Sequence, residues 1–210
     1  MLGLLLVVGG LAAIAFAVLA AHRDTGERTT AGRTRCVGEV GTGTPPAGEV
    51  PAPPPVAAST RYAKGRTPLC GFREAVLRVT TASGTVQNFC VLDAVNEAQR
   101  QRGLMKVRDR SLGGYDGMAF RFDTDQPGGF YMRNTPMPLS IAYVDAGHRV
   151  VDSYDMAPCA DRADCPSYPV AQPFRLAIEV PQGGLKRLGL TPGATAEVEP
   201  ATVACKAKSP

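Results

Sequence analysis

The sequence predicts a mainly β domain: a small sandwich or partly closed barrel of short antiparallel strands with one or two short helices. Two observations support this fold class. Apolar and polar side chains alternate over several short segments, which is the pattern of half-buried strands. Residues that favour turns separate these segments, and only two stretches have helical character. Many short strands with little helix favour a sandwich or a barrel.

The first expected element is a β-hairpin followed by a short helix. Apolar residues alternate with polar ones from 75 to 80, and Ala-Ser-Gly at 82–84 turns the chain into a second strand at 85–93. Asn96 can then cap a helix, with Gln99 reaching back to the cap, and Gly103 can end that helix in the left-handed conformation. We therefore expect one helix beside the sheet.

The remaining elements are also short. Asp-Ala-Gly at 145–147 predicts a type I turn between two strands, with Gly147 in the left-handed position. A second helical turn, closed by Gly189, is expected at 185–188. The further strands that we expect cover residues 118–122, 130–133, 139–144, 148–154, 175–180 and 194–198.

The chain divides into three parts. Residues 1–21 include 20 uncharged residues, enough to cross a membrane as a helix; this segment is a cleaved signal peptide or a transmembrane anchor, and both alternatives stay open. Residues 22–67 form a disordered stalk rich in Pro, Thr and Gly. Residues 68–205 form a single β-rich domain.

Two signals disagree about the side of the membrane on which the domain lies. Four arginines follow the apolar segment closely and no basic residue precedes it, which by the positive-inside rule would leave the domain in the cytoplasm. The six cysteines include no C-x-x-C pair, which favours disulfides and hence an oxidising compartment. We expect an extracytoplasmic domain, anchored or secreted. Cys159 and Cys165, separated by a short polar loop, are expected to form a disulfide, and the other pairings stay open.

The charge distribution argues against a nucleic-acid partner. Seven basic and four acidic side chains lie between His22 and Thr67, so three of the four net positive charges precede the domain. A nucleic-acid-binding domain carries its basic excess on itself. No cofactor is expected. Five methionines lie close together in the sequence and would suit Cu(I): Met105, Met118, Met132, Met137 and Met156. The strand alternation of Met118 and Met132 with Phe120 and Phe130 fits a hydrophobic core better.

Three ordered motifs resemble one bacterial and archaeal family. They are R-G-L-M at 102–105, G-M-A-F at 117–120 and F-Y-M-R-N-T-P-M-P-L at 130–139, followed by L-A-I-E-V at 176–180. Together they are similar to the domain of unknown function 192 (DUF192), in its disulfide-bearing variant, over about residues 76–198. The resemblance implies a compact, mainly β fold and no established activity. Tyr131, Arg133 and Ser140 replace the Trp, Lys and Asp of the family pattern.

The densest polar cluster lies in the longest motif. Arg133 could bind an anion through two hydrogen bonds, and Asn134 and Thr135 offer further donors and acceptors beside Tyr131. Arg102, inside the first motif, is a further candidate. These five residues are the predicted ligand site, for a small polar or anionic ligand or an envelope component. The alternative is that Asn134 and Thr135 only complete a turn and that Arg133 pairs with a neighbouring strand.

Enzyme signatures are mostly absent: the sequence has no G-x-S-x-G, H-E-x-x-H or phosphate-binding loop. We therefore expect a non-catalytic binding or accessory module of the cell envelope, with the N-terminal segment as its contact to the membrane. The alternative is a hydrolase of envelope material that uses two carboxylates. Its candidates are Asp93, Asp116, Asp145 and Asp155.

Overall fold

The computed structural model describes residues 66–67, 69–201 and 205. The expected membrane segment at 1–21 lies outside this range, as does almost all of the expected stalk at 22–67. Within the described residues, no helix is long and apolar enough to cross a membrane.

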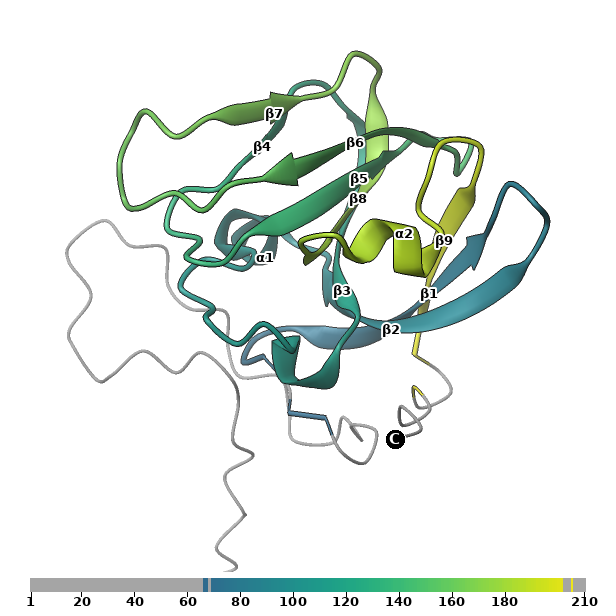
Figure 1. Ribbon diagram of the computed structural model, residues 1–210, viewed down its shortest axis with the longest axis horizontal. Helices are drawn as coiled ribbons and strands as arrows, with labels where there is room; N and C mark the ends of the chain where they lie inside the picture. The colour runs from purple at the N-terminus through teal and green to yellow at the C-terminus, as the bar shows by residue number, and fades with distance from the viewer. Residues whose placement is uncertain (1–65, 68, 202–204, 206–210) are drawn as a thin grey trace, which may run out of the picture. The chain divides into compact units, whose positions relative to one another are not determined.

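Nine strands and three short helical segments make up the described part of the chain (Figure 1). The helical segments are α1 (Glu97–Arg102), the 3-10 turn η1 (Leu112–Gly114) and α2 (Gly184–Leu188). The strands are β1 (Arg73–Thr80), β2 (Val86–Ala94), β3 (Gly117–Gln126), β4 (Gly129–Tyr131), β5 (Leu139–Val144), β6 (Val150–Met156), β7 (Ser167–Pro169), β8 (Phe174–Pro181) and β9 (Thr195–Pro200). The prediction of a mainly β domain is confirmed.

Seven strands form one sheet in the order β6-β5-β8-β3-β2-β1-β9, and β4 pairs with β7 separately. The sheet is sandwich-like and is not closed into a barrel, although an isolated bridge between Arg149 and Thr195 joins the starts of its two edge strands. One pair departs from the expected antiparallel arrangement, because β2 and β3 run parallel. The chain between them, which contains α1, is long enough for the crossover that a parallel pair requires.

Local sequence signals explain most of the connections. The expected hairpin is present as β1 and β2, paired from Arg73–Asp93 to Thr80–Val86. The side-chain oxygen of Asn96 accepts a hydrogen bond from the backbone N–H of Gln99, and the side-chain oxygen of Gln99 accepts one from the backbone N–H of Asn96. The predicted capping box is therefore present. The turn between β5 and β6 differs from the prediction. His148, not Gly147, has a positive φ, of 63°; its N–H donates to the carbonyl of Asp145 and so closes the turn.

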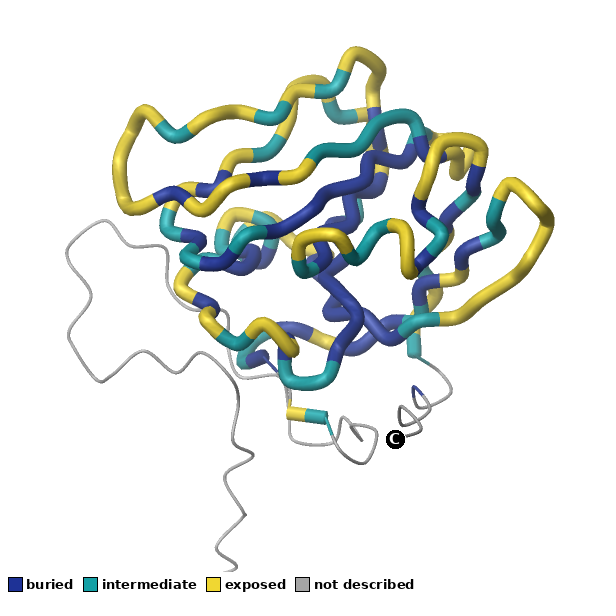
Figure 2. The backbone as a smooth tube through the Cα atoms, in the orientation of Figure 1, coloured by how far each residue is buried: buried dark blue, intermediate teal, exposed yellow. Residues whose placement is uncertain are grey.

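Both faces of the large sheet are covered. On one face Met118, Phe120 and Ile141 belong to a buried cluster that also includes the residues after α1. On the other face Ala119 and Ile178 pack in a second cluster with residues of α2 and β9. Figure 2 shows the buried residues concentrated along β5, β8 and β3, with exposed residues at the hairpin tips. A sheet buried on both faces explains why its central strands read as continuous apolar runs.

The methionines considered as copper ligands are mostly part of this core. Those at positions 118, 132, 137 and 156 are buried, and Met118 and Met132 keep the alternation expected of strand residues that pack inward. In the described part of the chain no group of three His, Cys, Asp or Glu side chains could hold a metal ion. Packing therefore accounts for these methionines.

Candidate functional site

The longest sequence motif folds as a tight turn after β4. Asn134 has a φ of 59°, a conformation that asparagine tolerates better than most residues. The N–H of Thr135 donates to the carbonyl of Met132 at 2.9 Å and closes the turn. Thr135 also forms an isolated β-bridge with Cys159. The turn is thus held by its own backbone and by the segment that contains the disulfide.

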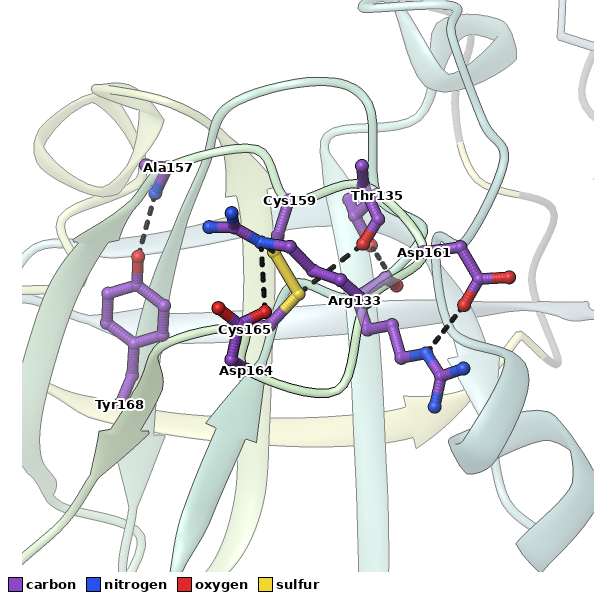
Figure 3. Close-up of a disulfide and its surroundings, with 10 residues drawn as sticks. Arg133, Thr135, Ala157, Cys159, Asp161, Asp164, Cys165 and Tyr168 are labelled. Atoms are coloured by element: carbon purple, nitrogen blue, oxygen red, sulfur yellow. Dashed lines mark hydrogen bonds and ion pairs between the residues drawn. A yellow bond between two sulfur atoms is a disulfide. The ribbon is translucent and has the colours of Figure 1, made fainter.

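The expected disulfide between Cys159 and Cys165 is present, with an S–S distance of 2.02 Å, and its loop lies beside this turn (Figure 3). Arg133 Nε donates to Asp161 Oδ1 at 2.7 Å, and the two side chains are 48% and 60% exposed. The hydrogen bond from Arg133 holds the pKa of Asp161 below its ordinary value. Arg133 is therefore engaged in a surface ion pair, as the alternative proposed, although its partner lies in the disulfide loop and not on a neighbouring strand.

Three further cysteines of the described residues are also disulfide-bonded. Cys90 in β2 is bonded to Cys205, 115 residues further along the chain. Cys70 is also disulfide-bonded. Within the described residues no cysteine is free, so a thiol nucleophile is not available there.

Two pockets adjoin the motif turn on different sides. One, of about 400 Å³, contains Asn134 from the predicted site. Its other lining residues are Lys106, Arg108, Pro136, Pro158, Cys159, Ala160 and Asp161. Apart from Cys159, none of them is fully buried. Its polar groups are therefore largely solvated, which weakens their interaction with a ligand.

The second pocket, of about 340 Å³, contains Arg102, Tyr131 and Thr135 from the predicted site. We call it the α1 pocket, because α1 and the turn after it form one wall, with β3, β4 and β8 opposite. Its other lining residues are Glu97, Arg100, Gln101, Gly103, Leu104, Met105, Phe120, Phe122, Gln126, Gly129, Phe130 and Glu179. The structure thus places three of the five predicted residues in one pocket and separates Arg133 and Asn134 from them.

The two guanidinium groups of the α1 pocket already have partners. Arg102 donates to the carbonyl of Cys70 at 2.6 Å and stacks on the ring of Phe72. Burial lowers its pKa. Arg100 donates to the carbonyls of Val95 and Arg121, each at 2.9 Å. The two arginines therefore stabilise the wall of the pocket, while the Nε–H of Arg100 is buried without a hydrogen-bond partner among the described residues.

Glu179 is the residue of the α1 pocket that the sequence interpretation missed. It lies in β8 between Met118 of β3 and Ile141 of β5, and its side chain is only 5% exposed. No hydrogen bond or ion pair joins it to another residue in the described ranges, and burial raises its pKa to about 8. The carboxyl group is therefore uncharged at neutral pH. A sequence signal exists: Glu179 is the only charged residue in L-A-I-E-V at 176–180.

The four aspartates considered for a hydrolase are all engaged elsewhere. Asp93 accepts two hydrogen bonds from Arg121, at 2.9 and 2.7 Å. Asp116 accepts from the Cys90 N–H and from Arg187, and Asp145 from backbone N–H groups of its own turn and from Arg149. Asp155 accepts from Ser140. None of the four lines either pocket.

Ser140, which departs from the family pattern, lies directly across from Asp155. Its hydroxyl donates to the Asp155 carboxylate and accepts from the N–H of Gly183 at 2.9 Å. The family pattern has an Asp at position 140, and here the carboxylate of Asp155 lies beside that position, on the neighbouring strand β6. This arrangement fixes the chain after β8 and adds no group to the α1 pocket.

The fold and the site together define a small, disulfide-bonded β domain with one pocket that contains a buried acid. The chain belongs to the DUF192 family, described as "Uncharacterized ACR, COG1430", whose model matches residues 78–198. The resemblance noted in the sequence is thereby confirmed. No curated protein matches the chain.

Similar solved structures include two bacterial proteins. One is a protein of unknown function from Novosphingobium aromaticivorans DSM 12444, with 30% identity and a TM-score of 0.51, over 74% of this chain and 99% of that one. The other is described as a "putative transcription regulator" from Sinorhizobium meliloti 1021, with 27% identity and a TM-score of 0.51, over 60% of this chain and 95% of that one. Both support the fold.

Proposed function

We propose that this chain is a non-catalytic binding module of the cell envelope, which holds a small ligand in the α1 pocket. One observation carries the proposal: the pocket contains the buried carboxyl group of Glu179, which has no partner in the described part of the chain, together with the aromatic rings of Phe120, Phe130 and Tyr131. At about 340 Å³ the pocket is within the size range of small-molecule sites. Aromatic side chains that offer a packing surface, with polar groups that can orient a ligand, are also typical of such sites.

The composition of the pocket favours binding over hydrolysis. A carboxylate-based hydrolase needs two acids in reach of the same bond. The second acid of the α1 pocket, Glu97, is a solvent-exposed residue at the rim and is paired with Arg100. Because the four candidate aspartates also lie outside the pocket, no observation favours the hydrolase.

The envelope location rests on the covalent bonds and the N-terminal sequence. The two disulfides, Cys90–Cys205 and Cys159–Cys165, are consistent with an oxidising compartment. We propose that residues 1–21 bring the chain to the membrane, as a cleaved signal or an anchor, and that residues 22–67 act as a spacer. The spacer would let the pocket reach a ligand or an envelope component away from the membrane surface.

Fragment binding to the full chain in detergent micelles tests the proposal. Methionine methyl groups labelled with 13C report on occupancy by NMR, because Met105 lines the pocket. We expect aromatic fragments to shift the Met105 signal. Tyr131→Ala should weaken their binding by about fivefold, or about 1 kcal/mol.

Val86→Ala is the matched control, since Val86 is 49% exposed and Tyr131 is 52% exposed. Val86 lies on β2 outside the pocket, so this variant should bind like the wild type. Equal weakening by both variants, or no Met105 shift with any neutral, cationic or anionic fragment, would contradict the proposed function.

A further inference from the structure

Glu179 is only 5% exposed, and among the described residues no hydrogen-bond or ion-pair partner is found for its carboxyl group. Its cross-strand neighbours Met118 and Ile141 are both apolar, and Phe120 and Phe130 meet edge to face at 4.9 Å in the same pocket. A polar group buried without a hydrogen bond costs about 1–3 kcal/mol. Since the side chain lines the α1 pocket, a ligand in that pocket can supply the missing hydrogen bond.

The surroundings decide which chemistry suits this position. The charged groups at the pocket are Arg100, Arg102 and Glu97 from α1. Both arginines already donate to backbone carbonyls, and Glu97 pairs with Arg100. The Nε–H of Arg100 is buried and has no hydrogen-bond partner among the described residues, so a ligand with an acceptor oxygen can satisfy a donor of this wall. A cationic ligand would share the pocket with two guanidinium groups of the same charge, which repel it.

Tyrosine hydroxyls are the other titratable groups nearby. Tyr143 of β5 is buried, and its hydroxyl donates to the carbonyl of Tyr168 at 2.6 Å. Tyr131 of β4 lies at the mouth of the pocket and is mostly exposed. Burial raises the pKa of Tyr143, so its phenol stays neutral and provides no charge for Glu179.

We propose that Glu179 anchors an uncharged ligand, by donating a hydrogen bond from its carboxylic acid to a carbonyl or similar acceptor oxygen. The inference rests on the proposed function and deepens it, because it names the chemical class that the α1 pocket selects. An aromatic or aliphatic body packs against Phe120 and Phe130, and the acceptor group reaches Glu179. A primary carboxamide fits best, because it can also donate back to the carbonyl oxygen of the acid.

Three probes of one size and different charge test this inference: benzamide, benzylammonium and benzoate. They are titrated into the full chain in micelles at about pH 6, where ordinary carboxylates are ionised and amines are protonated. The 13C methyl signals of Met105 and Met118 are followed by NMR. We expect benzamide to bind most tightly and to shift both signals.

Two substitutions identify the anchor. Glu179→Leu fills the space with an apolar side chain and should weaken benzamide binding by about tenfold, or about 1.4 kcal/mol. Glu179→Gln keeps a donor and an acceptor in the same shape and should stay within about threefold of the wild type. Benzamide binding should also weaken as the pH rises past about 8, where Glu179 ionises, and this decline should be absent from Glu179→Gln.

The outcomes separate the two proposals. If benzamide shifts Met105 with the same affinity in wild type and Glu179→Leu, the pocket binds ligands but Glu179 does not anchor them. If benzylammonium binds most tightly and Glu179→Gln abolishes its binding, the anchor is an ion pair and the inference is overturned. Tightest binding by benzoate would also overturn it. If none of the probes shifts Met105, the proposed function itself fails.

Discussion

Replacing Glu179 by glutamine should change how stability depends on pH. Burial raises the pKa of Glu179 from 4.5 to about 8 in the folded protein. Between these values the folded state holds a proton that the unfolded state has lost, so the free energy of unfolding falls as the pH rises. Stability from the protonated acid is complete below about pH 4.5 and is lost as the pH rises through about 8.

The magnitude follows from the same two values. Each pH unit between them corresponds to about 1.4 kcal/mol, so the wild type should lose up to about 5 kcal/mol relative to Glu179→Gln across this interval. Water entering the pocket would reduce this loss. The measurement is urea unfolding followed by far-UV circular dichroism at a series of pH values, with the disulfides intact.

Comparison between variants isolates the contribution of Glu179 from that of other titrating groups. Glu197→Gln is the matched control, since Glu197 is an exposed glutamate on β9; its stability profile should run parallel to that of the wild type. A difference between wild type and Glu179→Gln that stays constant within about 0.5 kcal/mol over the whole pH interval would refute the reasoning.

Three other substitutions test the contacts around the site, each by chemical unfolding. Arg121→Ala should cost about 3 kcal/mol, because it leaves Asp93 buried without its partner; a second change, Asp93→Asn, should recover much of that loss, and no recovery would contradict this cause. Joint replacement of Cys159 and Cys165 by serine should cost about 2 kcal/mol, since the closed loop is short; no loss of stability would exclude a role for this bridge. Arg133→Ala should cost less than about 0.5 kcal/mol, because its ion pair is exposed; a loss above about 2 kcal/mol would show that Arg133 does more than form a surface pair.

Local signals predicted the elements of the fold well. The capping box at Asn96, the first hairpin and the helical turn closed by Gly189 depend on residues within a few positions of each other, so the sequence carries them directly. The parallel pairing of β2 with β3 was not predicted, because the direction of a strand depends on where the intervening chain crosses the fold. The positive φ of His148 was not predicted either, because the sequence does not show which residue of a turn takes that conformation.

The candidate site was only partly predictable. Tyr131 and Thr135 were selected as candidates because they stand in a dense polar motif, and Arg102 was selected because it lies in another motif. The same reasoning selected Arg133, which the fold turns outward to Asp161. Glu179 was overlooked because it stands alone in an apolar strand, where a single acid gives no motif.

The sequence by itself determined the family, the mainly β class and the Cys159–Cys165 bridge, because motifs, alternation and short loops are properties of neighbouring residues. The tertiary structure alone decided which side chains share a pocket. Arg102 and Glu179 are 77 positions apart in the numbering of the chain, yet they line the same cavity. Only the tertiary fold, in which Arg100 of α1 contacts β3 through the carbonyl of Arg121, brings them together, and the burial that raises the pKa of Glu179 also results from packing.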